Sequence, residues 1–340
     1  MDKELYLYGL KYPTLCIDIL NFFRDDSIQS MYIDRLVRRM GNTILTKQVR
    51  APLDFISNHT HYKNLKEDAP IQPETINAIC SKLSDLKMLE KINMSDITTF
   101  AKEGDFYCIF GKHEKIQYSP QIQQYLNNLV YGFRYIYESS RTKILPIYVF
   151  SAQQNQSSIG TCFISTNGIV TAKHCLEKYD YACIPGIDTD LLNNAKILCN
   201  DKVDLALICF DNIKFFLENG LLFGKGSVLD DVLALGYPTH AGFDNFLTAT
   251  TGQITAIENS YIYKHNLMLL TGKIKGGNSG GPVLNGKGEV VGIITETPDP
   301  EGDYDKFGYG VAIPSEYVDD LNTLYDKKIK FDDNINKFMY

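Results

Sequence analysis

One short run, residues 276–282, has the composition that nucleophilic chemistry needs: it reads Gly-Gly-Asn-Ser-Gly-Gly-Pro, with Ser279 at its centre. A nucleophilic serine needs its hydroxyl exposed on a tight turn, and it needs backbone N–H groups aimed at the oxyanion that forms on a carbonyl. Glycines on both sides of the serine permit that backbone conformation and leave room for a substrate. Taken alone, such a run is equally typical of an ordinary loop.

A histidine and an aspartate upstream of Ser279 could complete this chemistry. His174 follows the apolar run 168–172, Gly-Ile-Val-Thr-Ala, which predicts a strand that ends just before it. A histidine at a strand end is a candidate general base, although a lone histidine is more often structural. Asp204 lies at the start of another apolar run, 203–208. Such an acid is often only a turn residue, but here it could orient the imidazole and stabilise its cation.

The three residues occur in the order His174, Asp204, Ser279, which is the order of the chymotrypsin-type template. The segments around them read T-A-K-H-C, D-L-A-L and N-S-G-G-P, and they resemble the T-A-A-H-C, D-I-A-L and G-D-S-G-G-P motifs of trypsin-like serine peptidases. The gaps of 30 and 75 residues resemble those of bacterial high-temperature-requirement proteases more than those of digestive enzymes. Further matches to that branch occur at residues 160–164, 235–238 and 310–315, so the resemblance covers about residues 146–325.

This resemblance implies two six-stranded β-barrels with the three residues in the cleft between them. It also implies an oxyanion hole formed by the N–H groups of Gly277 and Ser279. No Ile-Val-Gly-Gly-like activation sequence occurs near residue 146, so activation by a newly formed N-terminus is not expected. The peptide-binding module that follows the peptidase in high-temperature-requirement proteins is not expected either.

The same resemblance assigns a primary substrate pocket, with a lining at Lys273, Ile274, Thr295, Thr297, Gly310 and Ala312. No acidic residue stands at the position of trypsin's selector for basic side chains, so trypsin specificity is not expected. Ile274 indicates a small or medium apolar side chain at the cleaved position. Lys273 could select an acidic side chain instead, although a solvated loop lysine is the simpler interpretation.

The elements that must position these residues change in kind near residue 145. Beyond it, short β-rich runs alternate with Gly, Asn, Asp and Pro turns, which predicts an all-β sandwich or barrel. Before it, apolar residues recur at helical spacing in residues 13–24, 31–40, 73–89 and 119–141, with a strand-like piece at 105–110. The sequence therefore predicts an α+β multidomain chain: a mostly helical domain 1–145, an all-β chymotrypsin-like double β-barrel 146–325 and a C-terminal tail 326–340.

The helical region has some features of a winged helix-turn-helix domain. Residues 76–91 look like its recognition helix, with 89–92 leading into a wing and 106–110 returning. Basic residues cluster nearby: Arg35, Arg38, Arg39, Lys47 and Arg50. However, residues 1–145 contain 19 Lys and Arg against 17 Asp and Glu, whereas DNA binding calls for a basic face. We therefore favour a regulatory domain that contacts a protein partner over one that binds nucleic acid.

The bulk composition argues against several other classes of protein. The 340 residues carry a net charge of −7, so the chain has no general attraction for nucleic acid or anionic membranes. We expect no signal peptide, and no run approaches the about 18 apolar residues of a membrane span. The eight cysteines form no CxxC pair, so we expect no zinc site and no other metal or organic cofactor. Reduced thiols in the cytoplasm are favoured over a disulfide framework.

Together these observations predict a bacterial, cytoplasmic serine endopeptidase that acts on a protein or peptide substrate and is controlled by its helical domain. Ser279 would attack the peptide carbonyl, His174 would carry the proton to the leaving amine, and Asp204 would fix the tautomer of His174. The alternative is a DNA-binding winged-helix regulator whose protease half processes itself or a partner. A third interpretation is a scaffold that keeps the fold without the activity, against which the complete set of three residues argues.

Overall fold

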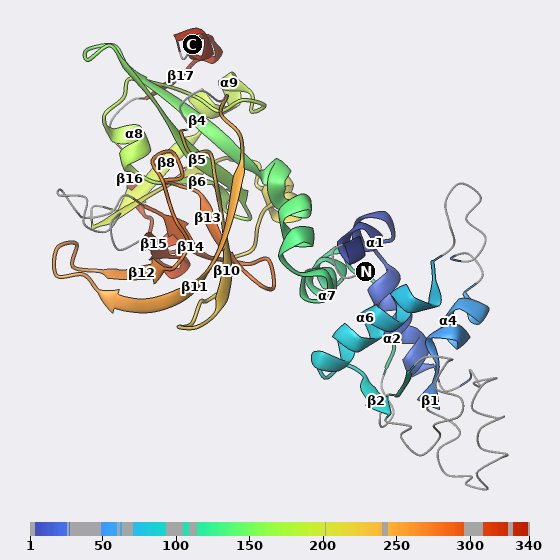
Figure 1. The fold of residues 1–340 in the computed structure, drawn as a ribbon. Coiled ribbons are helices and arrows are strands. Elements are labelled where there is room, and N and C mark those ends of the chain that lie inside the picture. The colour runs from blue at the N-terminus through green and yellow to red at the C-terminus, as the bar shows by residue number, and fades with distance from the viewer. Residues whose placement is uncertain are drawn as a thin grey trace, which may run out of the picture. The chain divides into compact units, whose positions relative to one another are not determined.

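The computed structural model describes residues 4–25, 27, 49–59, 62, 71–92, 105–108, 114–200, 202–239, 244–295, 309–325 and 329–338. The chain divides into two compact units, Met1–Tyr135 and Ile136–Tyr340, each with a hydrophobic core of its own (Figure 1). The division falls inside helix α7 (Pro120–Ser140), before the boundary predicted at residue 145.

The first unit is mostly helical, in agreement with the sequence prediction. Its helices are α1 (Leu5–Lys11), α2 (Leu15–Arg24), α4 (Pro52–Asn58), α6 (Pro73–Asp85) and the larger part of α7. Three short strands, β1 (Val49–Arg50), β3 (Phe106–Cys108) and β2 (Glu90–Ile92), form an antiparallel sheet in the order β1-β3-β2. Helices α2, α6 and α7 confirm three predicted helices, while the one predicted at 31–40 lies outside the described residues.

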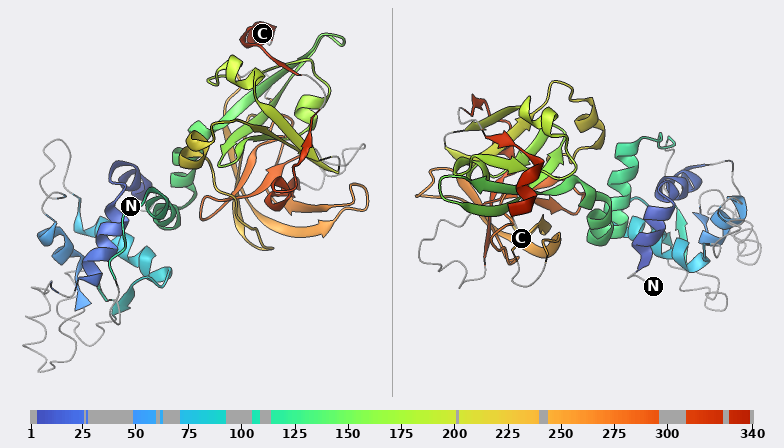
Figure 2. Two further views of the ribbon diagram at one scale, coloured as in Figure 1. Left: turned by 180° about the vertical axis from the view of Figure 1, so that it is seen from behind. Right: turned by 90° about the horizontal axis from the view of Figure 1, so that it is seen from above.

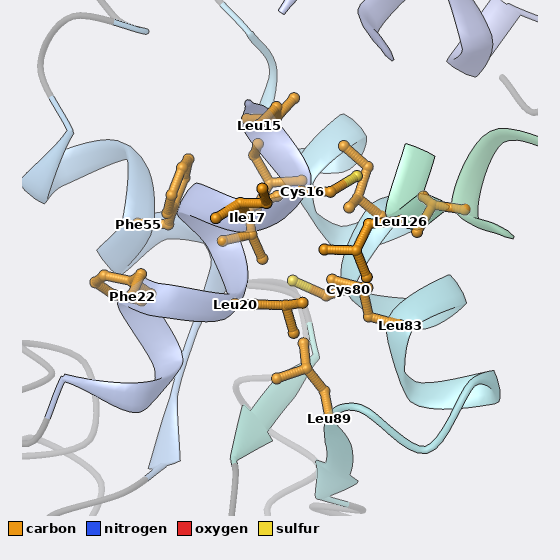
Figure 3. Packing of buried hydrophobic residues seen from close by; sticks show 14 of the residues in the cluster. Leu15, Cys16, Ile17, Leu20, Phe22, Phe55, Cys80, Leu83, Leu89 and Leu126 are labelled. Atoms are coloured by element: carbon orange, nitrogen blue, oxygen red, sulfur yellow. The ribbon is translucent and has the colours of Figure 1, made fainter. Parts of the chain in front are cut away.

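The core of the first unit is centred on α2, which buries most of its surface. Its buried residues are Leu15, Cys16, Ile17, Ile19, Leu20, Phe22 and Phe23. Figure 3 shows Cys16 and Leu20 beside Cys80 and Leu83 of α6, with Leu126 of α7 closing the cluster. Burying each large apolar side chain contributes about 1.5–3 kcal/mol, so this cluster gives the unit its own source of stability.

The predicted wing has a counterpart in the first unit, whereas most of the clustered basic residues lie outside the described residues. Strand β2 follows α6 and pairs antiparallel with β3, as the wing interpretation requires. Of the five clustered basic residues, only Arg50 lies among the described residues, and it is 1% exposed. Its guanidinium donates to the carbonyls of Phe22, at 2.6 Å, and of Asp25. Arg50 therefore stabilises the fold, and the likeness to a winged helix stays a prediction.

The second unit contains two sheets: strands β4 to β9 of the first are green to yellow in Figures 1 and 2, its β16 and β17 are red, and the strands of the second are orange to red. The first has eight strands in the order β16-β8-β9-β6-β5-β4-β7-β17: β4 (Ile144–Ser151), β5 (Gln156–Ser165), β6 (Gly168–Thr171), β7 (Tyr181–Cys183), β8 (Lys196–Asn200), β9 (Val203–Cys209), β16 (Thr323–Leu324) and β17 (Lys330–Phe331). The second is a closed barrel in the order β10-β11-β12-β15-β14-β13: β10 (Asp231–Gly236), β11 (Thr248–Asn259), β12 (Asn266–Leu270), β13 (Pro282–Asn285), β14 (Val290–Ile294) and β15 (Gly310–Pro314). Short helices α8 (His174–Glu177), α9 (Thr189–Asn193) and α10 (Lys214–Asn219) lie in the connections.

Both sheets share one connectivity. In each set of six, β4 to β9 and β10 to β15, the first strand pairs with the second and fourth, and the sixth strand with the third and fifth. In the barrel the fourth and fifth strands, β13 and β14, also pair and close the ring. In the first sheet the corresponding strands β7 and β8 pair instead with β17 and β16. The predicted double-barrel architecture is thus confirmed, with one barrel closed and the other open.

One edge of the first sheet is covered by strand β17, residues 330–331, which pairs with β7. At the end of α9, the Asn193 amide donates to the carbonyl of Phe331 and accepts from its N–H, both at 2.9 Å. The Phe331 side chain is 2% exposed and belongs to the core of this sheet. Residues 330–331 were predicted to lie in a tail, but they form strand β17 of the sheet. In a closed barrel β7 and β8 would pair with each other. Here β17 takes up the backbone hydrogen bonds that the edge of β7 would otherwise leave unpaired.

Candidate active site

Two neighbouring strands of the open sheet bring His174 and Asp204 together. β6 runs antiparallel to β9, with Thr171 opposite Ala206, so the chain leaving β6 passes the beginning of β9. His174 is the first residue of α8, and Asp204 is the second residue of β9. The N–H of Lys173 donates to the Asp204 carbonyl at 3.3 Å, which fastens the two segments to each other.

The Asp204 carboxylate accepts three hydrogen bonds. His174 Nδ1 lies 2.6 Å from Oδ2, and the backbone N–H of His174 donates to Oδ1 at 2.8 Å. The hydroxyl of Thr295 donates to Oδ2 at 2.6 Å. With Nδ1 carrying the proton that Asp204 accepts, Nε2 of His174 is left as the basic nitrogen.

The environment of His174 stabilises its protonated form. Burial lowers the pKa of the imidazole, but the hydrogen bonds to Asp204 and Cys175 and the charges of these groups outweigh it. The pKa of His174 therefore lies above its ordinary value of 6.5. Asp204 is the structural cause that we hold responsible, because its carboxylate contacts the ring at 2.6 Å.

The turn that carries Ser279 connects β12 to β13 of the closed barrel, and two of its glycines have conformations that side chains avoid. Gly277 has φ +94°, and an added Cβ would lie 2.4 Å from the Tyr237 carbonyl oxygen. Gly280 has φ +85°, and an added Cβ would lie 2.1 Å from the Thr161 carbonyl oxygen. The glycines on both sides of Ser279 are thus required by backbone conformation and by close approach of neighbouring backbone.

Most carbonyl groups of this turn accept hydrogen bonds, whereas several of its N–H groups have no acceptor among the described residues. Thr239 N–H donates to the Gly276 carbonyl at 3.0 Å. Thr161 donates from its hydroxyl to the Gly277 carbonyl and from its N–H to the Ser279 carbonyl, both at 2.8 Å. Among the described residues, the N–H groups of Gly277 and Ser279 have no hydrogen-bond acceptor. Two free donors in one turn can bind an oxyanion.

Ser279 lies beside the histidine segment. Cys175, the residue after His174, has its sulfur 3.7 Å from the Ser279 carbonyl oxygen and 3.8 Å from His174 Nε2. Within the described residues the Ser279 hydroxyl makes no hydrogen bond, including none to Nε2. Such bonds are commonly long before substrate binds, and tighten in the complex with substrate.

The residues predicted to line a pocket fall into three groups. Ile274 packs over Gly310, where an added Cβ would lie 2.4 Å from its Cδ1, and Ala312 is fully buried beneath them in the barrel core. Lys273 is exposed. The Thr295 hydroxyl donates to Asp204 Oδ2 at 2.6 Å, and Thr297 lies outside the described residues.

Two further contacts at the site were not predicted from the sequence: the hydrogen bonds of Thr161 to the serine turn and the approach of Cys175 to Nε2. Thr161 stands in the segment 160–164 that matches the family, but a threonine in a strand carries no signal of such a role by its type.

In the described part of the chain no cluster of three His, Cys, Asp or Glu side chains could hold a metal ion. Every helix described there is too short or too polar to cross a bilayer.

Known proteins with similar sequences are serine endoproteases. Residues 160–293 match the family model of the trypsin-like peptidase domain. A probable periplasmic serine endoprotease, DegP-like, from Buchnera aphidicola is 30% identical over 172 residues, which are 48% of this chain and 35% of that protein. Serine endoprotease DegS from Haemophilus influenzae is 26% identical over 175 residues, 50% of each chain. This chain thus spans between about a third and a half of the length of these relatives.

One solved structure that matches part of this chain is the active form of the Rv3671c protease from M. tuberculosis. It is 20% identical, with a TM-score of 0.43 over 55% of this chain and 82% of that one. The segment that matches the family model runs from β5 to β14 and includes His174, Asp204 and Ser279. The likeness to trypsin-like peptidases thus covers residues 160–293 by the family model, which is the part of the chain that holds these three residues.

Proposed function

We propose that this chain is a serine endopeptidase whose catalytic triad is His174, Asp204 and Ser279. The observation that carries the proposal is the contact of His174 Nδ1 with Asp204 Oδ2 at 2.6 Å. The residue after His174, Cys175, contacts the Ser279 carbonyl, so the histidine and the serine turn are neighbours. The two unengaged N–H groups of Gly277 and Ser279 form the oxyanion hole in this proposal.

The first chemical step forms the acyl-enzyme. The Ser279 hydroxyl attacks the substrate carbonyl, and Nε2 of His174 takes its proton. The negative charge that develops on the carbonyl oxygen accepts hydrogen bonds from Gly277 and Ser279 N–H. The imidazolium is stabilised by Asp204, whose Oδ2 also accepts the Thr295 hydroxyl at 2.6 Å. His174 then donates its proton to the leaving amine, and the C–N bond breaks.

The second step returns the enzyme to its starting state. A water molecule gives a proton to His174 Nε2 and attacks the acyl carbonyl, and the same two N–H groups hold the second oxyanion. His174 then returns the proton to the Ser279 oxygen as the ester bond breaks. All proton transfers pass through Nε2, because Nδ1 stays bonded to Asp204 throughout.

The proposed substrate class rests on the contact between Ile274 and Gly310. In this proposal Ile274, which packs against Gly310, leaves a shallow apolar space for the side chain at the cleaved position. We therefore propose cleavage after small aliphatic residues. The exposed Lys273 is a solvated loop residue in this proposal and does not select an acidic side chain.

We also propose that the first unit regulates the peptidase through a protein partner, because it has a core of its own and Arg50 is buried. The DNA-binding alternative would draw on basic residues such as Lys82, Lys87 and Lys91, which are exposed, and on those outside the described residues. The cytoplasmic location and the bacterial origin remain predictions, and the DegP-like relative named above is described as periplasmic.

The test of the proposed function is digestion of a defined peptide library by the purified chain, with cleavage sites mapped by mass spectrometry. We expect cleavage by the wild type and loss of turnover by about 10⁶-fold in Ser279→Ala, the size of the effect for the subtilisin serine. The matched control is Ser227→Ala, an exposed serine of the same unit, which should keep full turnover. Undiminished cleavage by a folded Ser279→Ala protein would refute the triad.

A further inference from the structure

Thr161 lies where the two sheets of the peptidase region meet. It is a residue of β5 in the open sheet, and it is completely buried. Its N–H donates to the carbonyl of Ser279 at 2.8 Å, and its own carbonyl accepts the hydroxyl of Thr171 at 2.8 Å. Its backbone is therefore fixed on both sides, which leaves the direction of its side chain well determined.

Both hydrogen-bonding capacities of the Thr161 hydroxyl are used. It accepts from the N–H of Tyr237, which follows β10, at 2.9 Å, and it donates to the carbonyl of Gly277 at 2.8 Å. The roles are unambiguous, because an amide N–H can only donate and a carbonyl oxygen can only accept. One hydroxyl thus joins the open sheet, the end of β10 and the serine turn.

These contacts act on the turn at two peptide units. The carbonyl of Gly277 belongs to the peptide that follows Gly277, and the carbonyl of Ser279 to the peptide that follows Ser279. The Gly277 N–H belongs to the preceding peptide, whose Gly276 carbonyl accepts from the Thr239 N–H at 3.0 Å. Thr161 and Thr239 therefore hold the peptides on both sides of Gly277, which limits rotation about its φ and ψ. The N–H groups of Gly277 and Ser279 have no acceptor among the described residues. Gly277, at φ +94°, has no side chain of its own to restrain it.

We propose that Thr161 is a positioning residue that holds the Gly277 N–H toward the oxyanion. The inference rests on the proposed function and adds a residue to it. Without the hydroxyl, the Gly277 carbonyl and the Tyr237 N–H lose their buried partner, and the turn gains conformations in which the N–H points elsewhere. Loss of this restraint weakens binding of the transition state more than binding of the substrate.

The experiment compares Thr161→Val, which keeps the shape and removes the hydroxyl, with Thr161→Ser, which keeps the hydroxyl. We measure kcat and KM on one peptide, and the affinity for a peptidyl boronic acid that forms an oxyanion-like adduct with Ser279. We expect Thr161→Val to lose about 10–100-fold in kcat with KM little changed, because removal of a whole oxyanion donor costs about 10²–10³-fold. Boronate affinity should fall in parallel, and Thr161→Ser should restore both.

Thr255→Val is the matched control, because the Thr255 hydroxyl also donates to a backbone carbonyl, that of Leu269 at 3.1 Å, but within the barrel. Circular dichroism establishes that each variant is folded, and Thr161→Ala replaces Thr161→Val if the valine does not fold. An active wild type with unchanged kcat in the variant, or a rise in KM alone, refutes the role of Thr161. A wild type that neither cleaves peptides nor reacts with a fluorophosphonate refutes the proposed function, and this inference with it.

Discussion

The open sheet and the closed barrel of the peptidase region share one connectivity but contribute different parts of the candidate site. The open sheet supplies His174 and Asp204, which contact each other directly through their side chains. The barrel supplies Ser279, the N–H groups of Gly277 and Ser279, and the contact of Ile274 with Gly310 that the proposed substrate pocket includes. The acid–base pair is thus held mainly within its own sheet, whereas the serine turn is held partly by Thr161 of the other sheet.

The two sheets also differ in what completes them. The barrel closes on itself, because β13 pairs with both β10 and β14. The open sheet depends on β16 and β17, which come from the last part of the chain. Damage to the end of the chain should therefore affect the sheet that carries His174 and leave the barrel less changed. The following substitutions test this division of roles.

The largest effect that we expect within the open sheet is on turnover. Asp204→Asn should lower kcat by about 10⁴-fold, as in the chymotrypsin-type triad, because the histidine then takes the wrong tautomer. The control is Asp230→Asn, since the Asp230 carboxylate accepts a backbone N–H, that of Ser227, away from the triad. Initial rates on one peptide measure the effect. A loss of less than tenfold in a folded Asp204→Asn protein would mean that another group orients the base.

The next effect concerns the stability of the open sheet. Phe331→Ala should lower the free energy of unfolding by about 3–5 kcal/mol, because it removes a ring that is 2% exposed. Leu324→Ala, in β16 at the other edge, should change it by less than about 0.5 kcal/mol, because Leu324 is 56% exposed. Chemical denaturation monitored by circular dichroism gives both values. Equal effects would show that β17 is no more a part of the sheet's core than β16.

A smaller change is expected in specificity, which belongs to the barrel. Ile274→Ala should raise kcat/KM for a substrate with leucine at the cleaved position, relative to one with alanine, by about 10–100-fold, because the shallow pocket deepens. Lys273→Ala should leave this ratio unchanged. If Lys273→Ala instead abolished cleavage after aspartate or glutamate, the exposed lysine would be the selector and the proposed substrate class would be wrong.

The mildest test is the pH dependence of the acid–base pair. Catalysis needs neutral His174, and the pKa of His174 is raised by Asp204, so kcat/KM should rise with pH about a midpoint above 6.5. Asp204→Asn should move the midpoint down. The protonated pair stabilises the fold fully below pH 6.5, and this stability is lost as the pH rises through the folded-state pKa. If Asp204→Asn left the midpoint of the pH profile unchanged, Asp204 would not be the group that raises the pKa of the catalytic base.

The sequence predicts the parts of the site that depend on local backbone. Ser279 between glycines and His174 after an apolar strand can be identified because the chemistry needs those residue types at those places. Thr295 could not be assigned to Asp204, because the direction of a side chain at a strand end depends on the register of the folded sheet. Thr161 was missed for the same reason, since its partners lie 76 and 116 residues away in the chain.

The fold was predictable to the same degree. Helices α2 and α6 follow from apolar spacing, and the β-rich half from its turns. The addition of β17 to the open sheet was not predictable, because it depends on a hydrogen bond between Asn193 and Phe331, which lie 138 residues apart. The chain divides inside α7, near Gly132 with its non-helical backbone, whereas the apolar pattern of the sequence stays helical to residue 141.

The most direct test of the central claim is covalent labelling by a fluorophosphonate, which reacts with a serine only when a base activates it. The purified chain is treated with the probe and digested, and the labelled peptide is sequenced by mass spectrometry. We predict a single labelled residue, Ser279, and a labelling rate at least about 10³-fold lower in a folded His174→Ala variant. Absence of label from Ser279, or equal labelling in the His174→Ala variant, would contradict the assignment of a histidine-activated serine.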